Sequence, residues 1–227
     1  MQPLATPRAV AAVVFDLDGI LVDTEPFWAD AKHEVTDANG GHWRADAPTA
    51  MLGMSGPEWS QWMHDDLGVS LPPDEIRTQV VEGMLRRIRE GLSLLDGAGR
   101  AVASIAARWP VGLASSADRP VIEAVLEATE LSGYFRAIVS SDEAGRGKPA
   151  PDVYLAAAER LGAAPEATVA IEDSGNGMRA AKAAGMGLIA IPIAHTPVDT
   201  DVLAEADVVL TAITELTPEQ VERALGL

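Results

Sequence analysis

The 227-residue sequence contains no cysteine, which excludes disulfides, thiolate metal sites and cysteine nucleophiles. Basic residues are few, because 17 Lys and Arg stand against 34 Asp and Glu, and the formal net charge is −17. A chain this acidic repels nucleic acid and anionic membrane surfaces, so we expect neither as a partner. No apolar run approaches the length of a membrane span. These absences suit a cytoplasmic protein, and a monomer is the default expectation.

Hydrophobic residues make up 48% of the chain, enough for a packed core with a small inserted domain. Six short apolar runs predict strands buried on both faces, and helical patterns separate most of them. This alternation predicts an α/β fold, a Rossmann-like parallel sheet flanked by helices. The predicted strands are Ala9–Phe15, Val111–Ala114, Ala137–Val139, Thr168–Ile171, Gly187–Ile191 and Asp207–Leu210, and the helices among them are Gly97–Arg108, Arg119–Thr129, Asp152–Leu161 and Asn176–Ala184.

The segment from Thr24 to about residue 95 breaks this alternation. It holds no convincing strand but four of the five Trp residues, and helical patterns cover Pro26–Asn39, Pro57–Leu67 and Pro73–Glu90. We therefore expect an inserted α-helical cap domain over residues 24–95. The α/β core domain would then comprise residues 1–23 and 96–227.

Two acidic residues follow the first predicted strand, in the sequence Phe15-Asp16-Leu17-Asp18-Gly19. Ligands of open parallel sheets bind beyond the carboxyl ends of the strands, so these positions are candidates for chemistry. Carboxylates at i and i+2 point to the same face, where their like charges raise a pKa unless a cation relieves the repulsion. Hard oxygen ligands suit Mg²⁺. The alternative is a solvated turn, since Asp and Gly both favour turns.

Three later predicted strands also end in polar residues. Ser115 and Ser116 offer hydroxyl and main-chain N–H groups that suit phosphate oxygens, although Ser is also a common helix N-cap. Lys148, on a loop restrained by Gly and Pro, can neutralise a phosphoryl group, although a loop Lys is usually only solvated. Glu172 and Asp173 suggest further metal ligation, or an acidic helix start. Because these signals follow separate strands in order, together they indicate one phosphoryl-transfer site.

Four sequence motifs now show a resemblance to a known family. They are DLDGILVDTE, the SS after VGLA, the K of GRGKP, and IEDSGNG, and through them the whole chain resembles the haloacid-dehalogenase superfamily. The helical insert resembles the small cap domain of that family. DTEPFW and VGLASSA resemble the branch that contains sugar-phosphate phosphatases, acting on hexitol phosphates and 2-deoxyglucose 6-phosphate, and β-phosphoglucomutase. The resemblance implies a Mg²⁺-dependent phosphatase of a small phosphorylated metabolite, such as a sugar or sugar-alcohol phosphate; phosphoglycolate also fits the motifs.

The resemblance also implies a role for each motif residue. Asp16 would be the nucleophile that forms an aspartyl-phosphate, and Asp18 the general acid and base. Ser115, the Ser116 N–H and Lys148 would bind the phosphoryl oxygens. The implied Mg²⁺ ligands are the Asp16 side chain, the Asp18 main-chain carbonyl and Asp173, with Glu172 acting directly or through a water.

The cap should close over the site and supply substrate contacts. An aromatic face there could stack on a sugar ring. The alternative is that these Trp residues form the cap's own core, because the spacing of Trp59 and Trp62 fits one helix face. The candidates for substrate contact are Glu25, Trp28, Met54, Ser55 and Trp59.

Two other functions remain as alternatives. A phosphosugar mutase of the β-phosphoglucomutase type would carry a cap Arg in a stretch that resembles residues 53–56, but Gly56 occupies the matching place. Trp28 also stands where the mutase has a His. A catalytically silent binding module would lack catalytic residues, whereas here every such position is filled. Haloacid dehalogenation is disfavoured because those relatives lack the second acid of the first motif, which is Asp18 here.

Overall fold

The sheet contains six parallel strands in the order β3-β2-β1-β4-β5-β6. This computed structural model describes residues 9–52, 54–193 and 198–227, so expectations for residues 1–8 and 53 lie outside the described residues. All six predicted strands are present, which confirms the expected α/β class. Their bounds are β1 (Ala12–Phe15), β2 (Val111–Ser115), β3 (Phe135–Ser140), β4 (Thr168–Glu172), β5 (Gly187–Ala190) and β6 (Val208–Val209).

Helices and short helical turns make up most of the remaining described chain, including the segment between β1 and β2. The α-helices are α1 (Glu25–Ala38), α2 (Ala47–Ala50), α3 (Gly56–Asp66), α4 (Pro73–Glu90), α5 (Ala98–Ala106), α6 (Arg119–Ala128), α7 (Ser141–Ala144), α8 (Asp152–Leu161), α9 (Gly175–Ala183), α10 (Thr200–Leu203) and α11 (Pro218–Arg223), and the 3₁₀ turns are η1 (Pro165–Ala167) and η2 (Ile213–Glu215). No described helix has the combination of length and apolar character that crossing a membrane requires.

Strand β1 lies at the centre of the sheet, between β2 and β4. Val13 is in register with Val111 on one side and with Val169 on the other. From β1, strands β2 and β3 follow on one side of the sheet, and strands β4, β5 and β6 follow on the other. Strand order therefore reverses between β1 and β4, and the carboxyl ends of these two strands border the crevice where such sheets bind ligands.

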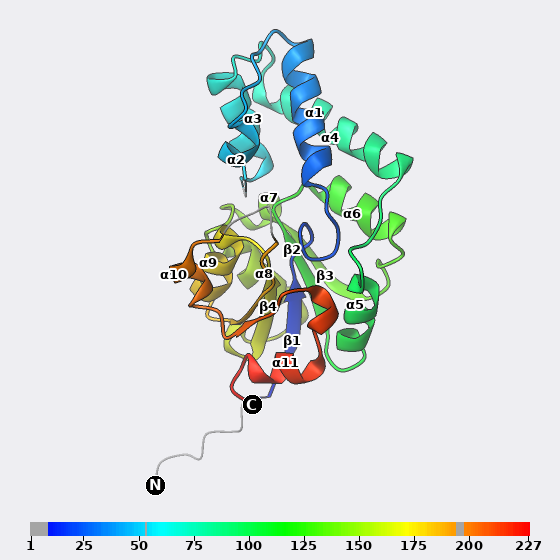
Figure 1. The fold of residues 1–227 in the computed structure, drawn as a ribbon, viewed down its shortest axis with the longest axis vertical. Helices are drawn as coiled ribbons and strands as arrows, with labels where there is room; N and C mark the ends of the chain where they lie inside the picture. Colours follow the sequence, from blue (N-terminus) through cyan, green and yellow to red (C-terminus); the bar gives the residue numbers. More distant parts are fainter. Residues whose placement is uncertain (1–8, 53, 194–197) are drawn as a thin grey trace.

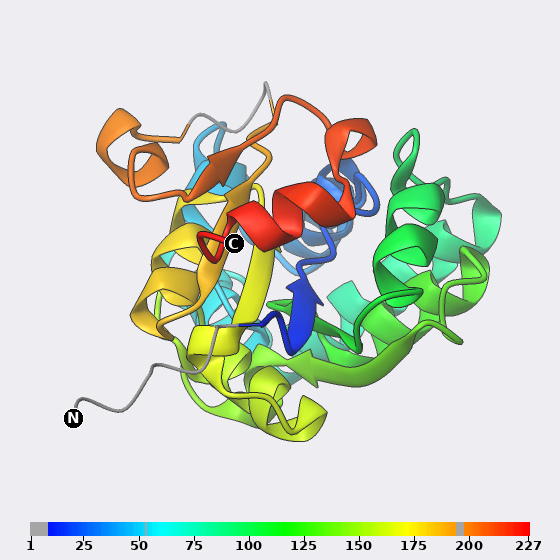
Figure 2. The same cartoon turned by 90° about the horizontal axis from the view of Figure 1, so that it is seen from below.

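Helices cover both faces of the sheet, as Figure 2 shows. Val13 and Phe15 belong to an apolar cluster with residues of α5, α6 and α11, whereas Val14 belongs to a second cluster with residues of α8 and α9. Alternate side chains of β1 thus point to opposite faces. Strands β1, β4 and β5 are buried along their whole length, because helices cover both faces of the sheet there.

Helices α1–α4 stand above the carboxyl edge of the sheet (Figure 1), and we call them the cap helices. Helix α4 packs against both α1 and α3, and it also contacts α6 beside the sheet. The two chain segments that join the cap helices to the rest lie side by side. Val22 bridges Leu94, and the Leu95 N–H donates to the Leu21 carbonyl at 2.8 Å. The sequence predicted α1, α3 and α4, but not the four-residue α2.

Candidate active site

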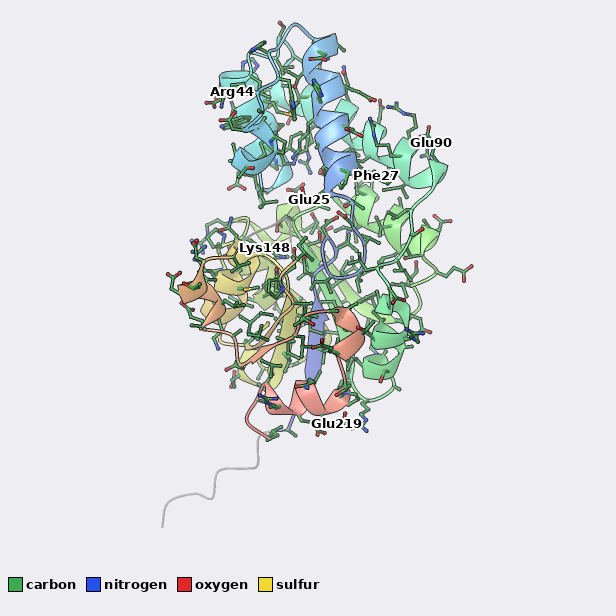
Figure 3. The ribbon with its side chains drawn as sticks, in the orientation of Figure 1. Glu25, Phe27, Arg44, Glu90, Lys148 and Glu219 are labelled. Atoms are coloured by element: carbon green, nitrogen blue, oxygen red, sulfur yellow. The ribbon has the colours of Figure 1, made fainter. Side chains whose placement is uncertain are left out.

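A cavity that is partly open to solvent lies between the cap helices and the carboxyl edge of the sheet. A concave site of this kind suits a small ligand. In Figure 3, Glu25 lies at the base of α1 and Lys148 lies below it, where the cap helices meet the sheet. Most of the predicted site residues line the cavity, namely Asp16, Asp18, Glu25, Trp28, Met54, Trp59, Ser115, Ser116, Lys148 and Asp173.

Lys148 holds the carboxylate of Asp16 at the floor of the cavity. Its ammonium donates to Asp16 Oδ1 at 2.6 Å, to Glu172 Oε1 at 2.7 Å and to the Ala114 carbonyl at 3.2 Å. Burial lowers the pKa of Lys148, but the charges of Asp16 and Glu172 more than offset this, and the net shift of the pKa is upward. Lys148 therefore stays charged at any physiological pH.

Glu172 positions Lys148, and its two oxygens have little remaining capacity to accept further bonds. Its Oε1 accepts hydrogen bonds from Lys148 and from the Tyr154 hydroxyl at 2.8 Å. Its Oε2 accepts from the N–H groups of Asp173 and Ser174, each at 3.0 Å, and from the Ser174 hydroxyl at 3.1 Å. A carboxylate offers about four acceptor sites, so both oxygens are already occupied. This favours a positioning role for Glu172 over direct metal ligation.

A glycine in α9 makes room for the Glu172 carboxylate. A Cβ atom at Gly177 would lie 1.6 Å from Glu172 Oε1. The Gly177 N–H also donates to the Ser174 hydroxyl at 3.1 Å, which caps the start of α9. The Gly-rich turn after β4 thus serves close packing of the carboxylate against the helix.

Asp16 and Asp173 form a buried acidic pair beside Glu172. Burial is the main reason that the pKa of Asp16 rises to about 7 and that of Asp173 to about 9, and neighbouring carboxylates add to both shifts. Oxygen atoms of Asp16, Glu172 and Asp173 lie within 4.8 Å of one another. Closely spaced hard oxygen donors of this kind fit a divalent cation such as Mg²⁺.

Asp18 lies beside this pair with its carboxyl group in a different setting. Burial and the negative charge of Asp16 raise the pKa of Asp18 well above its usual value. The Thr24 hydroxyl donates a short hydrogen bond to Asp18 Oδ1. A raised pKa favours the protonated form of Asp18, which is the form that a general acid needs. Thr24 was not among the predicted site residues, although it follows Asp23 within the first motif.

Gly19 lets the turn after β1 pass close to Asp173. Its φ is +79°, and a Cβ atom there would lie 2.2 Å from Asp173 Oδ2. A side chain at this position would therefore meet both backbone strain and a direct clash with the carboxylate.

Ser115 and Ser116 end β2 on the wall of the cavity. Ser115 is buried, and its oxygen accepts a hydrogen bond from the Ala117 N–H at 3.0 Å. The Ser115 hydroxyl proton remains able to donate, because a hydroxyl group both accepts and donates. The turn thus offers a hydroxyl donor at the same cavity wall as Lys148.

The predicted cap residues differ in whether they line the cavity. Trp28, Met54, Trp59 and Glu25 line the cavity, and the two indole rings lie 6.1 Å apart between centroids. Ser55 does not line it; instead, its hydroxyl donates to Glu58 Oε2 at 2.7 Å at the start of α3. The sequence analysis missed the remaining lining residues of the cap, which are Lys32, Pro48, Met51 and Leu52.

An arginine joins the cap helices to the edge of the sheet. Arg77 of α4 forms ion pairs with Asp118, which precedes α6, and with Asp142 of α7. Asp118 is largely buried, and burial raises its pKa although Arg77 opposes the shift. A second close approach lies at Gly147, where a Cβ atom would be 2.8 Å from Glu58 Oε2. The cap helices therefore touch the loops that carry the site.

The parallel sheet order and the helical insert after β1 define a Rossmann-like α/β fold, with acidic turns after β1 and β4. The family model described as haloacid dehalogenase-like hydrolase matches residues 10–185. The chain belongs to the haloacid dehalogenase-like hydrolase family and is a phosphoric monoester hydrolase.

Relatives with named activities support this class. Hexitol phosphatase B of Escherichia coli (strain K12) is 37% identical over 223 residues, which cover 94% of this chain and 97% of that protein. A phosphorylated carbohydrates phosphatase of Thermotoga maritima is 31% identical, with 94% of this chain and 97% of that protein covered. The crystal structure of CbbY from Rhodobacter sphaeroides in complex with phosphate has a TM-score of 0.85 and 29% identity, and the match covers 94% of this chain and 99% of that chain.

Proposed function

We propose that this enzyme hydrolyses a small sugar or sugar-alcohol phosphate through an aspartyl-phosphate on Asp16, with Mg²⁺ as cofactor. The observation that carries the proposal is the Asp16 carboxylate, held 2.6 Å from the Lys148 ammonium in a cavity that Asp18 and Asp173 also line. The substrate class is supported by the relatives, which include a hexitol phosphatase and a phosphorylated carbohydrates phosphatase.

In the first step, an Asp16 oxygen attacks phosphorus while the bond to the substrate oxygen breaks. Asp18 donates its proton to that leaving oxygen, a role supported by its raised pKa. Lys148 and the Ser115 hydroxyl stabilise the negative charge on the equatorial phosphoryl oxygens. In the second step, Asp18, now ionised, accepts a proton from water as the water attacks phosphorus. The bond to Asp16 then breaks and inorganic phosphate leaves.

The proposed ligands of Mg²⁺ are the Asp16 and Asp173 carboxylates and the Asp18 main-chain carbonyl. Glu172 completes the acidic cluster but acts as a positioning residue, because its oxygens already accept five hydrogen bonds from Lys148, Tyr154 and the turn after β4. When bound, the cation supplies positive charge that offsets the repulsion between a carboxylate nucleophile and a phosphate dianion.

We further propose that residues 24–95 act as a cap domain that closes over the site and excludes water. The division is supported by the paired connections at Val22 and Leu94, where both chain crossings lie together. Residues 1–23 and 96–227 would form the core domain. In this proposal Glu25, Trp28, Met54 and Trp59 face the substrate, whereas Ser55 stabilises the start of α3.

A mutase would need a free cap cation for a second phosphate near Gly56. The cation next to Gly56 is Arg77, since a Cβ atom at Gly56 would lie 2.6 Å from Arg77 Nε. Arg77 is engaged by the carboxylates of Asp118 and Asp142. This engagement leaves Arg77 unavailable for a second phosphate at that place. An assay for β-glucose 1-phosphate isomerisation, run beside the phosphate assay, separates the two reactions.

The test is phosphate release from a panel of phosphometabolites, with and without Mg²⁺, by wild type and Asp16→Asn. We expect Asp16→Asn to lose at least about 10³-fold in kcat, as loss of a nucleophile typically does, while it keeps the wild-type unfolding midpoint. Asp37→Asn is the matched control, because Asp37 is exposed and pairs only with an exposed histidine in the described chain. Near-normal turnover by Asp16→Asn would overturn the assignment, and no hydrolysis of any phosphate ester would favour a silent binding module.

A further inference from the structure

Lys32 is a buried cation on the cap side of the cavity. It lies on α1 at i+7 from Glu25 and i+4 from Trp28, so all three side chains share the face of the helix that lines the cavity. Lys32 is 8% exposed. Seven helical residues span about 10 Å, which places Lys32 well above Glu25 at the base of α1. The backbone of Lys32 therefore lies farther from the cavity floor than that of Glu25.

The Lys32 ammonium lies over two indole rings. Its Nζ is 5.5 Å from the ring centroid of Trp28 and 5.0 Å from that of Trp59. Both distances fall within the range of cation–π attraction. The ring faces that were candidates for stacking on a sugar thus hold an ammonium instead. An ammonium has three donors and no acceptor, so this part of the cavity offers hydrogen bonds to ligand oxygens.

The charge of Lys32 is only partly compensated by its neighbours. Burial lowers the pKa of Lys32 to about 8, although Glu25, Asp118 and Asp18 all act to raise it. Of these carboxylates, Asp118 is shared with Arg77. An anionic group on the ligand would supply the missing compensation, because hydrogen bonds between charged partners are the stronger ones.

We propose that Lys32 is a specificity-determining residue that binds a second anionic group, a carboxylate or phosphate, at the substrate end remote from the transferred phosphoryl group. The proposal rests on the phosphatase function above and names its substrate class more narrowly. The Trp28 and Trp59 rings hold the ammonium in place, and the apolar side chains of Met51 and Leu52 help to form the same wall.

Three substrates that differ only at C1 test the proposal: glucitol 6-phosphate, gluconate 6-phosphate and glucitol 1,6-bisphosphate. They carry a hydroxyl, a carboxylate and a phosphate at the remote end, so they also separate the two sources of the anion. We expect Lys32→Met to lower the ratio of kcat/KM for the preferred anionic substrate to that for glucitol 6-phosphate by about 10- to 100-fold, mainly through KM, as loss of a charged hydrogen bond does. Lys32→Arg should retain part of this preference. Arg86→Met is the control, because Arg86 is an exposed cap cation paired with Glu34.

Equal losses on all three substrates, or an unchanged ratio, would overturn the proposal. Binding provides a second measurement that does not depend on turnover. In the Asp16→Asn background, calorimetry should show that Lys32→Met weakens binding of gluconate 6-phosphate or glucitol 1,6-bisphosphate by at least about tenfold more than binding of glucitol 6-phosphate. If wild type hydrolyses none of the three, the binding ratio still decides the role of Lys32, and the phosphometabolite panel decides the proposed function separately.

Discussion

The Lys148 ammonium lies 2.6 Å from the Asp16 carboxylate, although 132 residues separate the two in the chain. The sheet creates this contact, because the loop after β3 and the end of β1 meet at one edge. Both side chains are buried, and the same ammonium also contacts Glu172 at 2.7 Å. One cation therefore fixes the proposed nucleophile and the carboxylate that follows β4.

Lys148→Met should reduce both turnover and stability. Loss of one electrostatic contact to the transferred group typically costs about 10²–10³-fold in kcat. Removal of one partner from a buried ion pair also costs about 3–5 kcal/mol of the free energy of unfolding. Steady-state kinetics and urea unfolding measure the two effects. Lys182→Met is the matched control, since Lys182 pairs with Asp207 at the surface at 3.0 Å, and it should change neither quantity by much. Wild-type kcat in Lys148→Met would contradict the assignment.

The metal-free protein should lose stability as pH rises through the neutral range. The pKa values of Asp16 and Asp173 are raised from 3.8 to about 7 and about 9, so the folded state binds more protons than the unfolded state between these limits. Stability then falls with increasing pH. Mg²⁺ binds the ionised carboxylates, so it should raise Tm more at about pH 8.5 than at about pH 5.5.

Thermal unfolding in EDTA and in Mg²⁺ at the two pH values checks this expectation. Asp173→Asn should reduce both the pH dependence and the effect of Mg²⁺, because it removes the carboxyl group whose pKa is raised to about 9. An identical Mg²⁺ shift at the two pH values would show that the cation does not bind these carboxylates.

Arg77→Met should weaken the contact between the cap helices and the sheet edge. It leaves the largely buried Asp118 and Asp142 without their cation, which costs about 1–3 kcal/mol of the free energy of unfolding. We also expect kcat/KM to fall about tenfold, because a small displacement of the cap misplaces the groups that face the substrate. Arg86→Met on the same helix removes an exposed pair and should cost less than about 1 kcal/mol. Equal effects of the two substitutions would refute a special role for Arg77.

Gly177→Ala should lower the activity of the enzyme, although Gly177 does not line the cavity. In an ordinary helix this change stabilises by up to about 1 kcal/mol, but here the new methyl group would lie 1.6 Å from Glu172 Oε1. Displacement of Glu172 would move Lys148, so we expect kcat to fall at least about tenfold. Gly133→Ala is the control, because no atom lies within 4 Å of a Cβ atom there. Wild-type activity and unfolding in Gly177→Ala would show that Glu172 has room to adapt.

The sequence predicted the sheet well because its strands are mostly apolar and are separated by helical patterns. All six strands were expected, although β1 begins at Ala12 and β6 is limited to Val208–Val209. The short helices α2, α7 and α10 were missed, since four residues carry too little periodicity to be recognised.

The acidic and basic residues after the strands could be named from the sequence because parallel strands bring their carboxyl ends to one edge. Tyr154 and Lys32 could not. Tyr154 lies within an apolar stretch of α8, and its hydrogen bond to Glu172 depends on how that helix packs. Lys32 resembles a solvated helix residue in the sequence, and only the fold places it over Trp28 and Trp59. The roles of Tyr154 and Lys32 therefore depend on tertiary contacts, which the local sequence pattern does not reveal.

The close approach of Gly19 to Asp173 also bears on how this protein can be re-engineered. A library that diversifies residue 19 should yield almost only inactive clones, because any side chain there both strains the turn and displaces the carboxylate. The cap wall at Met51, Leu52 and Met54 carries no such constraint from the turn after β1. Directed evolution toward new substrates will therefore accumulate its substitutions in the cap and leave the floor of the cavity unchanged.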